Sequence, residues 1–175
     1  IVLSEATSVA YHLENYARLC AELRGYTHRS VISFLDIYPK IKRRLVEMER
    51  QGTKLTAIDL SDPISPSHGM NIIRLFVSEL AKIARENQME IISCAEPVDF
   101  HAYGVKAGKC IDDEFISKVF GLEVAKAKDP SQRKACGCVR SKDIGMYDSC
   151  LFGCHYCYAT SSFERAKVNY LRHDP

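Results

Sequence analysis

The segment Met89-Glu-Ile-Ile-Ser-Cys94-Ala95 is a short apolar run rich in isoleucine, and it predicts a buried β-strand. A helical pattern stands directly before it. Apolar residues recur there at three- and four-residue steps, which predicts an amphipathic helix over residues 71–87. The apolar face of that helix consists of Ile72, Phe76, Leu80, Ile83 and Ala84. This helix and strand form one step of an α/β alternation.

The chain upstream repeats the alternation. Residues 30–36, Ser-Val-Ile-Ser-Phe-Leu-Asp, predict another buried strand between amphipathic helices at residues 9–25 and 39–52. Gly25 ends the first of these helices and Pro39 opens the second. The alternation predicts an α/β fold of parallel β-α units, which we expect to form part of a TIM-like barrel.

Functional groups in parallel sheets and barrels gather where the strands end at their carboxyl side. Asp36 and Tyr38 follow one predicted strand, and Cys94 and Glu96 follow the next. These side chains would therefore share one edge of the sheet. Each of these residues, taken alone, could also have a purely structural role as a cap or turn residue.

Regular patterning weakens beyond Pro97. Asp112 or Asp113 can cap a short helix. The side chains expected to face inward from this helix are Phe115, Ile116, Val119 and Phe120. From residue 126 to 158 we expect irregular backbone ordered by metal ligation, because binding free energy then becomes folding free energy.

The predicted domain boundary lies after residue 97. Residues 1–97 are expected to be the C-terminal part of a barrel-like α/β domain whose N-terminal portion is missing, since the sequence starts inside an apolar run. Residues 98–175 are expected to be a Cys-rich, iron–sulfur-binding extension packed on that domain.

The composition is that of a soluble globular protein, with 46% hydrophobic and 26% charged residues. No apolar stretch approaches the roughly twenty residues that span a bilayer, so we expect no membrane insertion. Eight cysteines in 175 residues are too few for a small disulfide scaffold, which favours a reducing cytoplasm. Neither a phosphate-binding glycine loop nor a hydrolase motif occurs in the sequence.

The cysteines divide by position. Cys20 lies on the apolar stripe of the first helix and is expected to be a buried core residue. The remaining seven are four upstream thiols, Cys94, Cys110, Cys136 and Cys138, and a terminal set, Cys150, Cys154 and Cys157. Four thiolates complete a closed cluster or a zinc site, whereas three leave one iron of a cubane open. A single site that takes its fourth ligand from Cys136 or Cys138 is the alternative.

The terminal set is the most specific chemical signal. In Cys150-Leu-Phe-Gly-Cys154-His-Tyr-Cys157, three thiols on one tight loop can bind one face of an iron–sulfur cube. Tetrahedral zinc usually draws paired ligands from two separate loops. The leading interpretation is therefore an iron–sulfur protein, and a zinc knuckle that includes His155 is the alternative.

This motif, with Tyr156 before the last thiol, resembles the cluster motif of radical S-adenosylmethionine enzymes. The resemblance implies that Cys150, Cys154 and Cys157 hold a [4Fe–4S] cluster whose open iron chelates S-adenosylmethionine, with Tyr156 near the adenine. One electron delivered by a donor would cleave the sulfonium bond and start radical chemistry. Asp36 and Glu96 are then the candidates for substrate contact as catalytic residues.

Nearly the whole chain is similar to the domain-of-unknown-function 1848 family, whose C-terminal cysteines resemble those of radical S-adenosylmethionine proteins. The resemblance also implies a longer N-terminus in complete members. The segments that carry it are Gly25-Tyr-Thr27, Val31-Ile-Ser-Phe-Leu-Asp36, Cys94-Ala-Glu96, Lys109-Cys-Ile-Asp112, Gln132-Arg133, Cys136-Gly-Cys138, Ser141, Asp143-Ile-Gly145, Tyr147 and Gly153-Cys-His-Tyr-Cys-Tyr-Ala159.

Two other functions fit the residues. A non-catalytic electron-transfer or sensing module would use its thiols for clusters that only change oxidation state. A zinc-stabilised nucleic-acid-binding module would use the basic segment 126–142 for the backbone and aromatic side chains for stacking. The aromatic residues available for stacking are Tyr147, Phe152 and Tyr158. The net charge of only +2 gives this second alternative little support, although a small anionic substrate would suit the local basic bias.

Overall fold

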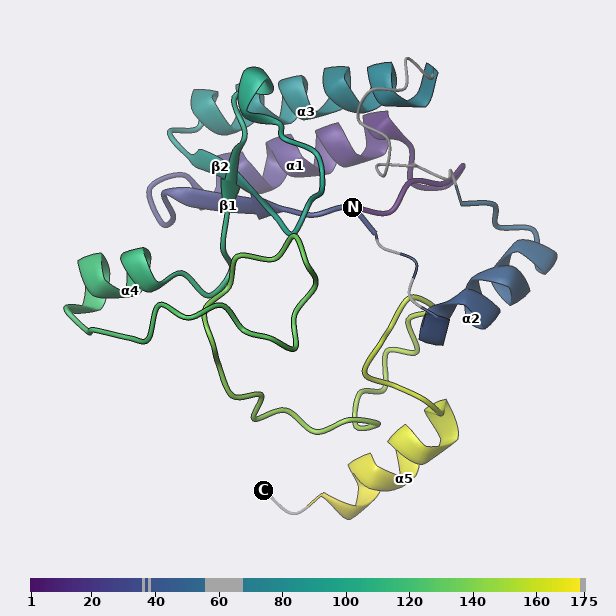
Figure 1. Cartoon of the computed structure of the whole chain (residues 1–175). Helices are drawn as coiled ribbons and strands as arrows, with labels where there is room; N and C mark the ends of the chain where they lie inside the picture. The colour runs from purple at the N-terminus through teal and green to yellow at the C-terminus, as the bar shows by residue number, and fades with distance from the viewer. Residues whose placement is uncertain (36, 38, 56–67, 174–175) are drawn as a thin grey trace. The chain divides into compact units, whose positions relative to one another are not determined.

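The computed structural model describes residues 1–35, 37, 39–55 and 68–173. The chain divides into two compact units: unit 1 consists of Ile1–Phe34 and Thr56–Ser141, and unit 2 of Leu35–Leu55 and Lys142–Pro175. Figure 1 labels the helices α1–α5 and the strands β1 and β2. The boundary expected after residue 97 stays a prediction. Of the helices described, none is both long and apolar enough to cross a membrane.

Unit 1 is built on a parallel sheet. Its strands are β1 (Arg29–Ile32), β2 (Glu90–Cys94) and β3 (Lys106–Gly108), in the order β1-β2-β3. Both pairings are parallel, with Arg29 opposite Glu90 and Cys94 opposite Gly108. The predicted α/β class with parallel β-α units is therefore confirmed. Over the described ranges the sheet has three strands and is not closed into a barrel.

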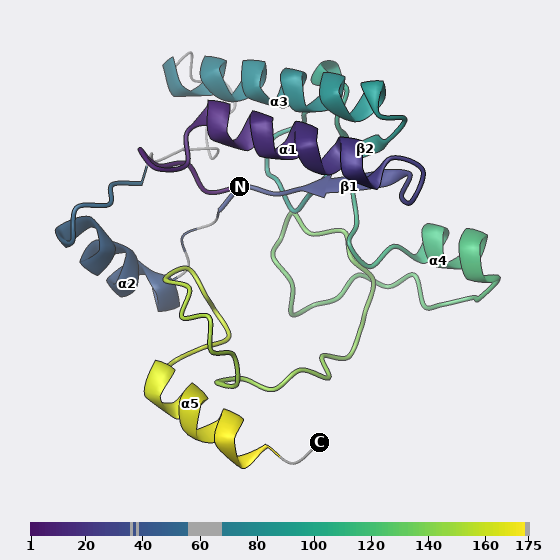
Figure 2. The same ribbon diagram turned by 180° about the vertical axis from the view of Figure 1, so that it is seen from behind.

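Two helices cover one face of this sheet (Figures 1 and 2). They are α1 (Val9–Leu23), which Ser8 caps through a bond from the Tyr11 N–H, and α3 (His68–Glu86). Helix α3 packs against both α1 and β2. Both helices were predicted from apolar periodicity to within a few residues of these bounds.

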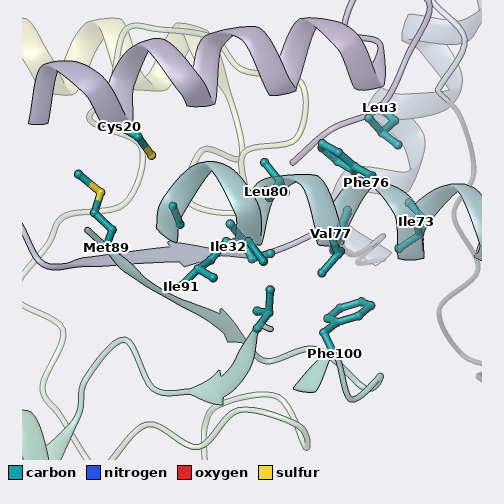
Figure 3. Packing of buried hydrophobic residues seen from close by; sticks show 14 residues of the cluster. Leu3, Cys20, Ile32, Ile73, Phe76, Val77, Leu80, Met89, Ile91 and Phe100 are labelled. Carbon is teal, nitrogen blue, oxygen red and sulfur yellow. The ribbon is translucent and has the colours of Figure 1, made fainter. Parts of the chain in front are cut away.

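The core of unit 1 fills the space between these helices and the sheet, as Figure 3 shows. Its largest fully buried side chains include Phe76 and Leu80 of α3 and Phe100 beyond β2. Cys20 is 3% exposed and belongs to this cluster, which confirms it as a core residue. The core therefore packs against the face of β2 that the helices cover. Cys94 is the last residue of this strand.

The segment after β2 contains the short helix η1 (His101–Tyr103), the strand β3 and the helix α4 (Asp113–Phe120). Asp112 caps α4, as predicted, by accepting bonds from the N–H groups of Glu114 and Phe115. The prediction that its apolar residues face inward is wrong for Phe115, Val119 and Phe120, which are 40%, 53% and 65% exposed. The helix has only eight residues, and Phe115 packs under the Arg29 guanidinium instead.

Unit 2 contains α2 (Pro39–Arg50) and α5 (Phe163–Arg172). Pro39 opens α2 as predicted, and Ile41 and Leu45 on its apolar face are buried. Ser162 caps α5 by accepting a bond from the Arg165 N–H. Between residues 142 and 162 the described backbone is irregular, as expected from the sequence.

Candidate metal centre

The carboxyl edge of the sheet in unit 1 brings two cysteines together. Cys94 is the last residue of β2, and its partner in the parallel register is Gly108, the last residue of β3. Cys110 follows two positions later. Gly108 is required for this approach, because a Cβ at its position would lie 2.4 Å from Cδ1 of Ile92. A side chain there would push β3, and Cys110 with it, away from β2.

A third cysteine, Cys138, lies on the loop at residues 127–140. The Val139 N–H donates to the Ile111 carbonyl at 3.2 Å, and the Asp129 N–H donates to the Cys138 carbonyl at 3.0 Å. Lys128 and Val139 form an isolated antiparallel bridge. These backbone bonds, and not a helix or strand, hold Cys138 beside Cys110.

The Sγ atoms of Cys94, Cys110 and Cys138 all lie within 4.8 Å of one another, and the described residues contain no other such group of three potential metal ligands. Cys136 joins them: it packs in one buried cluster with Cys94 and Cys138, and its thiol interacts with that of Cys138. We call these four residues the quartet. Cys94, Cys136 and Cys138 are buried, whereas Cys110 is exposed.

The thiols of the quartet differ in their ease of ionisation. Burial, followed by the neighbouring Cys110 thiol, raises the pKa of Cys94 to about 12. Burial also raises the pKa of Cys136. Burial opposes ionisation of Cys138 as well, but hydrogen bonds from the Ile111 N–H and the Cys136 thiol outweigh it and lower its pKa. The Ile111 N–H lies 3.4 Å from Cys138 Sγ. Cys138 is thus the main hydrogen-bond acceptor of the group.

A lysine borders the quartet. The aliphatic stem of Lys109 passes over Gly137, where an added Cβ would lie 3.3 Å from Lys109 Cγ. The Lys109 ammonium donates to the Asp113 carboxylate at 2.5 Å, and this bond raises the pKa of Lys109. The positive charge is therefore held in place next to the Cys136-Gly-Cys138 segment.

The triplet, which is Cys150, Cys154 and Cys157, lies in unit 2 on a loop whose two ends are tied together. The Asp148 N–H donates to the Ala159 carbonyl at 3.0 Å, and the Asp148 carboxylate accepts from the hydroxyl and the N–H of Ser161. These bonds, with the hydroxyl first, lower the pKa of Asp148. Unlike Cys94, Cys110 and Cys138, the three thiols of the triplet do not all lie within 4.8 Å of one another.

Arg44 of α2 binds the same loop from a distant part of the sequence. Its guanidinium donates to the Cys157 carbonyl at 3.0 Å and also to the Thr160 carbonyl, and it stacks on the Phe163 ring. Burial raises the pKa of the Cys157 thiol, but the Thr160 hydroxyl, nearby N–H groups and the Arg44 charge outweigh it, and the pKa is lowered. No local pattern predicts this role of Arg44, because 113 positions separate it from Cys157.

The remaining predicted site residues have separate environments. Glu96 follows β2 and accepts from the Ser33 hydroxyl at 2.9 Å and from the Phe34 N–H at 2.7 Å, so it ties the ends of β1 and β2 together. Asp36 lies outside the described residues. Tyr156 is 49% exposed. The catalytic roles of Asp36 and Glu96 and the cofactor contact of Tyr156 stay predictions.

The aromatic side chains available for base stacking are exposed, with Phe152 at 90%, Tyr158 at 60% and Tyr147 at 52%. In the basic segment the Lys128 ammonium instead donates to the Lys134 carbonyl at 2.5 Å. Nucleic-acid binding stays a prediction.

The fold and the site define an α/β protein with a cluster of free thiols that can bind a metal at the carboxyl edge of its parallel sheet. The chain matches the family model described as domain of unknown function (DUF1848) over residues 1–159, and it belongs to that family. No curated protein and no solved structure matches it.

Proposed function

We propose that this protein is an iron–sulfur protein with two thiolate metal centres, one at the quartet and one at the triplet. The observation that carries thiolate metal binding is the convergence of Cys94, Cys110 and Cys138, whose sulfur atoms lie within 4.8 Å of one another without forming a disulfide. The iron–sulfur assignment itself rests on the spacing of the three thiols of the triplet. Clustered buried thiols are costly to ionise, and a bound cation offsets that cost. Free thiols in this number also suit a reducing compartment such as the cytoplasm.

The triplet is proposed to hold a [4Fe–4S] cluster of the radical S-adenosylmethionine type. Three thiolates on one loop leave one iron for another ligand, and a bound cluster would supply one-electron chemistry from an external electron donor. Two features of unit 2 support the site: Asp148 closes the base of the loop, and Arg44 lowers the cost of negative charge at Cys157. Tyr156 would contact the cofactor.

Glu96 and Asp36 are proposed to contact the substrate. In a barrel-like arrangement of parallel strands, both would follow strands at the functional edge. Glu96 accepts two hydrogen bonds in this structure, so its carboxylate has a fixed position. A small anionic molecule is the class of substrate that the local basic segment would attract.

The test is the metal and acid-labile sulfide content of anaerobically purified protein, compared with a variant that lacks the triplet (C150A/C154A/C157A). We expect about four irons and four sulfides to disappear with the triplet. The loss should include the visible absorption and the electron paramagnetic resonance signal of the reduced cluster. Cys20→Ala is the matched control, because this thiol lies in the hydrophobic core and its removal should leave the metal content unchanged.

The radical chemistry has its own readout. Reconstituted protein with a strong reductant and S-adenosylmethionine should release deoxyadenosine, and the triplet variant should not. A protein that carries the cluster and is reduced reversibly, but releases no deoxyadenosine, would be an electron-transfer or sensing module instead. Zinc without sulfide at both sites would overturn the iron–sulfur proposal.

A further inference from the structure

We infer that the quartet binds a single tetrahedral metal ion as a closed structural site and does not hold an iron–sulfur cube. This inference deepens the proposed function, because it names the ligand of one of the two proposed centres. It rests on the geometry of the quartet alone and does not depend on what the triplet binds.

The first argument is the spacing of the sulfur atoms. Ligands of one tetrahedral ion lie about 3.8 Å apart when each metal–sulfur bond is about 2.3 Å long, as for zinc. Cys94, Cys110 and Cys138 already place their Sγ atoms within 4.8 Å of one another. In a cubane cluster each thiolate binds a different iron atom, so the thiolates stand farther apart. The observed approach of these three sulfur atoms suits one ion that they share.

The second argument is the origin of the ligands. Cys94 ends β2 and Cys110 lies two residues beyond the paired strand β3, whereas Cys136 and Cys138 come as a pair from one loop. Structural zinc sites characteristically combine ligands from two separate segments. Cys136 completes a set of four, since it is 5% exposed and packs in the same cluster as Cys94 and Cys138.

The third argument is the closure of the site. Three of the four thiols are buried, and Cys138 receives a hydrogen bond from the Ile111 N–H at 3.4 Å. Four thiolates around a divalent ion leave two net negative charges, which the N–H donor and the Lys109 side chain over Gly137 partly offset. No ligand position remains for a substrate, so the ion would be structural.

The consequence for folding is specific to the loop at residues 127–140. This loop contains one isolated bridge and a few backbone bonds, so it has little regular structure of its own. A metal that joins Cys136 and Cys138 to Cys94 and Cys110 would fix the loop to the sheet edge.

The experiment uses the triplet variant C150A/C154A/C157A, in which only the quartet can bind metal through several thiols. The reduced apoprotein is titrated anaerobically with cobalt(II) ions. We expect saturation at one equivalent, with thiolate-to-cobalt charge transfer and the intense ligand-field bands of a tetrahedral ion. X-ray absorption of the zinc form should then give four sulfur neighbours at about 2.3 Å and no second metal nearby.

Ligand variants supply the second readout. Cys136→Ala in this background should weaken cobalt binding by more than about tenfold and shift the ligand-field bands as the sulfur count falls to three. Cys20→Ala should change neither. If Cys136→Ala fails to fold, the stoichiometry and the sulfur count of the parent variant still decide the question.

Three outcomes would overturn the inference: binding of two or more cobalt ions per quartet, the weak spectrum of an octahedral ion, or incorporation of four irons with four sulfides in the triplet variant. The last result would place a cube in the quartet. A normal cobalt site at the quartet together with no cluster at the triplet would instead refute only the proposed function.

Discussion

The thiols of the quartet reach one another from two strand ends and a loop, whereas those of the triplet share a single loop of unit 2. The quartet is gathered by strand register and by the glycine that lets β3 approach β2, and three of its sulfur atoms lie within 4.8 Å. The triplet is enclosed at its base by Asp148 but does not gather its sulfur atoms in this way. Thiols that the fold already holds close together favour binding of a single structural ion. Thiols that lie apart on one loop favour a larger cluster, whose binding would order the loop.

Metal removal tests this contrast most strongly. Chelation of the reduced, metal-loaded protein should destabilise unit 1 by about 4 kcal/mol relative to loading at a thousandfold excess over Kd. Hydrogen exchange should accelerate mainly at residues 94–140, which include the quartet. The metal-loaded triplet variant, which keeps the quartet, should be much less destabilised in unit 1 when compared with the metal-loaded wild type. A loss in this variant as large as the loss caused by chelation would mean that both cysteine groups contribute alike to the folding of unit 1.

Opening the base of the triplet loop tests the other side of the contrast. Asp148→Ala removes the carboxylate that accepts from Ser161 and Ser162, so exchange of those two amides should accelerate by about tenfold or more. Cluster retention at the triplet should fall with it. Asp143→Ala is the control, because Asp143 is exposed and accepts a hydrogen bond from the nearby Gly145 N–H. Unchanged exchange at Ser161 would show that the loop closes without Asp148.

An element can be predicted from the sequence when the residues that determine it are close together in the chain. Periodicity predicts α1 and α3 well, since the pattern of one helix is local. It misses β3, because Lys106-Ala-Gly108 has three residues and none of them is β-branched. The terminal helix α5 was also missed.

The two cysteine groups of the candidate site also differ in how far they can be predicted from the sequence. The triplet can be recognised from spacing, because all its thiols lie in eight residues. The grouping of the four upstream thiols was proposed from their number, but spacing could not show that Cys94 meets Cys110 and Cys138. That meeting follows from the register of β2 with β3 and from the bond between Val139 and Ile111. Such long-range pairings leave no local pattern.

A methyl group at Gly108 should disturb the quartet without removing any ligand. Gly108→Ala places Cβ 2.4 Å from Cδ1 of buried Ile92, and overpacking of this kind costs about 1–3 kcal/mol. We expect lower thermal stability and weaker cobalt binding by the quartet. In the control Gly137→Ala, the nearest atom is Cγ of the flexible Lys109 side chain at 3.3 Å, so the loss should be smaller. Equal effects would mean that strand approach does not limit assembly of the quartet.

The smallest effect is expected at the opposite edge of the sheet, where the first residues of the strands, Arg29, Glu90 and Lys106, form ion pairs. The Lys106 ammonium and then the Arg29 guanidinium outweigh partial burial and lower the pKa of Glu90. The stabilisation is therefore complete above the ordinary carboxyl pKa and is lost as the pH falls through the lower folded-state value. Because the Glu90 side chain is 35% exposed, Glu90→Gln should cost less than about 1 kcal/mol at pH 7.

The difference in stability between the wild-type and Glu90→Gln apoproteins should vanish in acid, and thermal unfolding at several pH values measures it. Apoprotein is required because acid also releases metal from thiolates. Glu79→Gln, which breaks an exposed pair with Lys82 on α3, should change little at any pH. Cobalt binding by the quartet should be the same in Glu90→Gln as in the parent protein. Weaker binding would mean that assembly of the quartet depends on the amino edge of the sheet through Arg29, which also holds Asp112 at the start of α4.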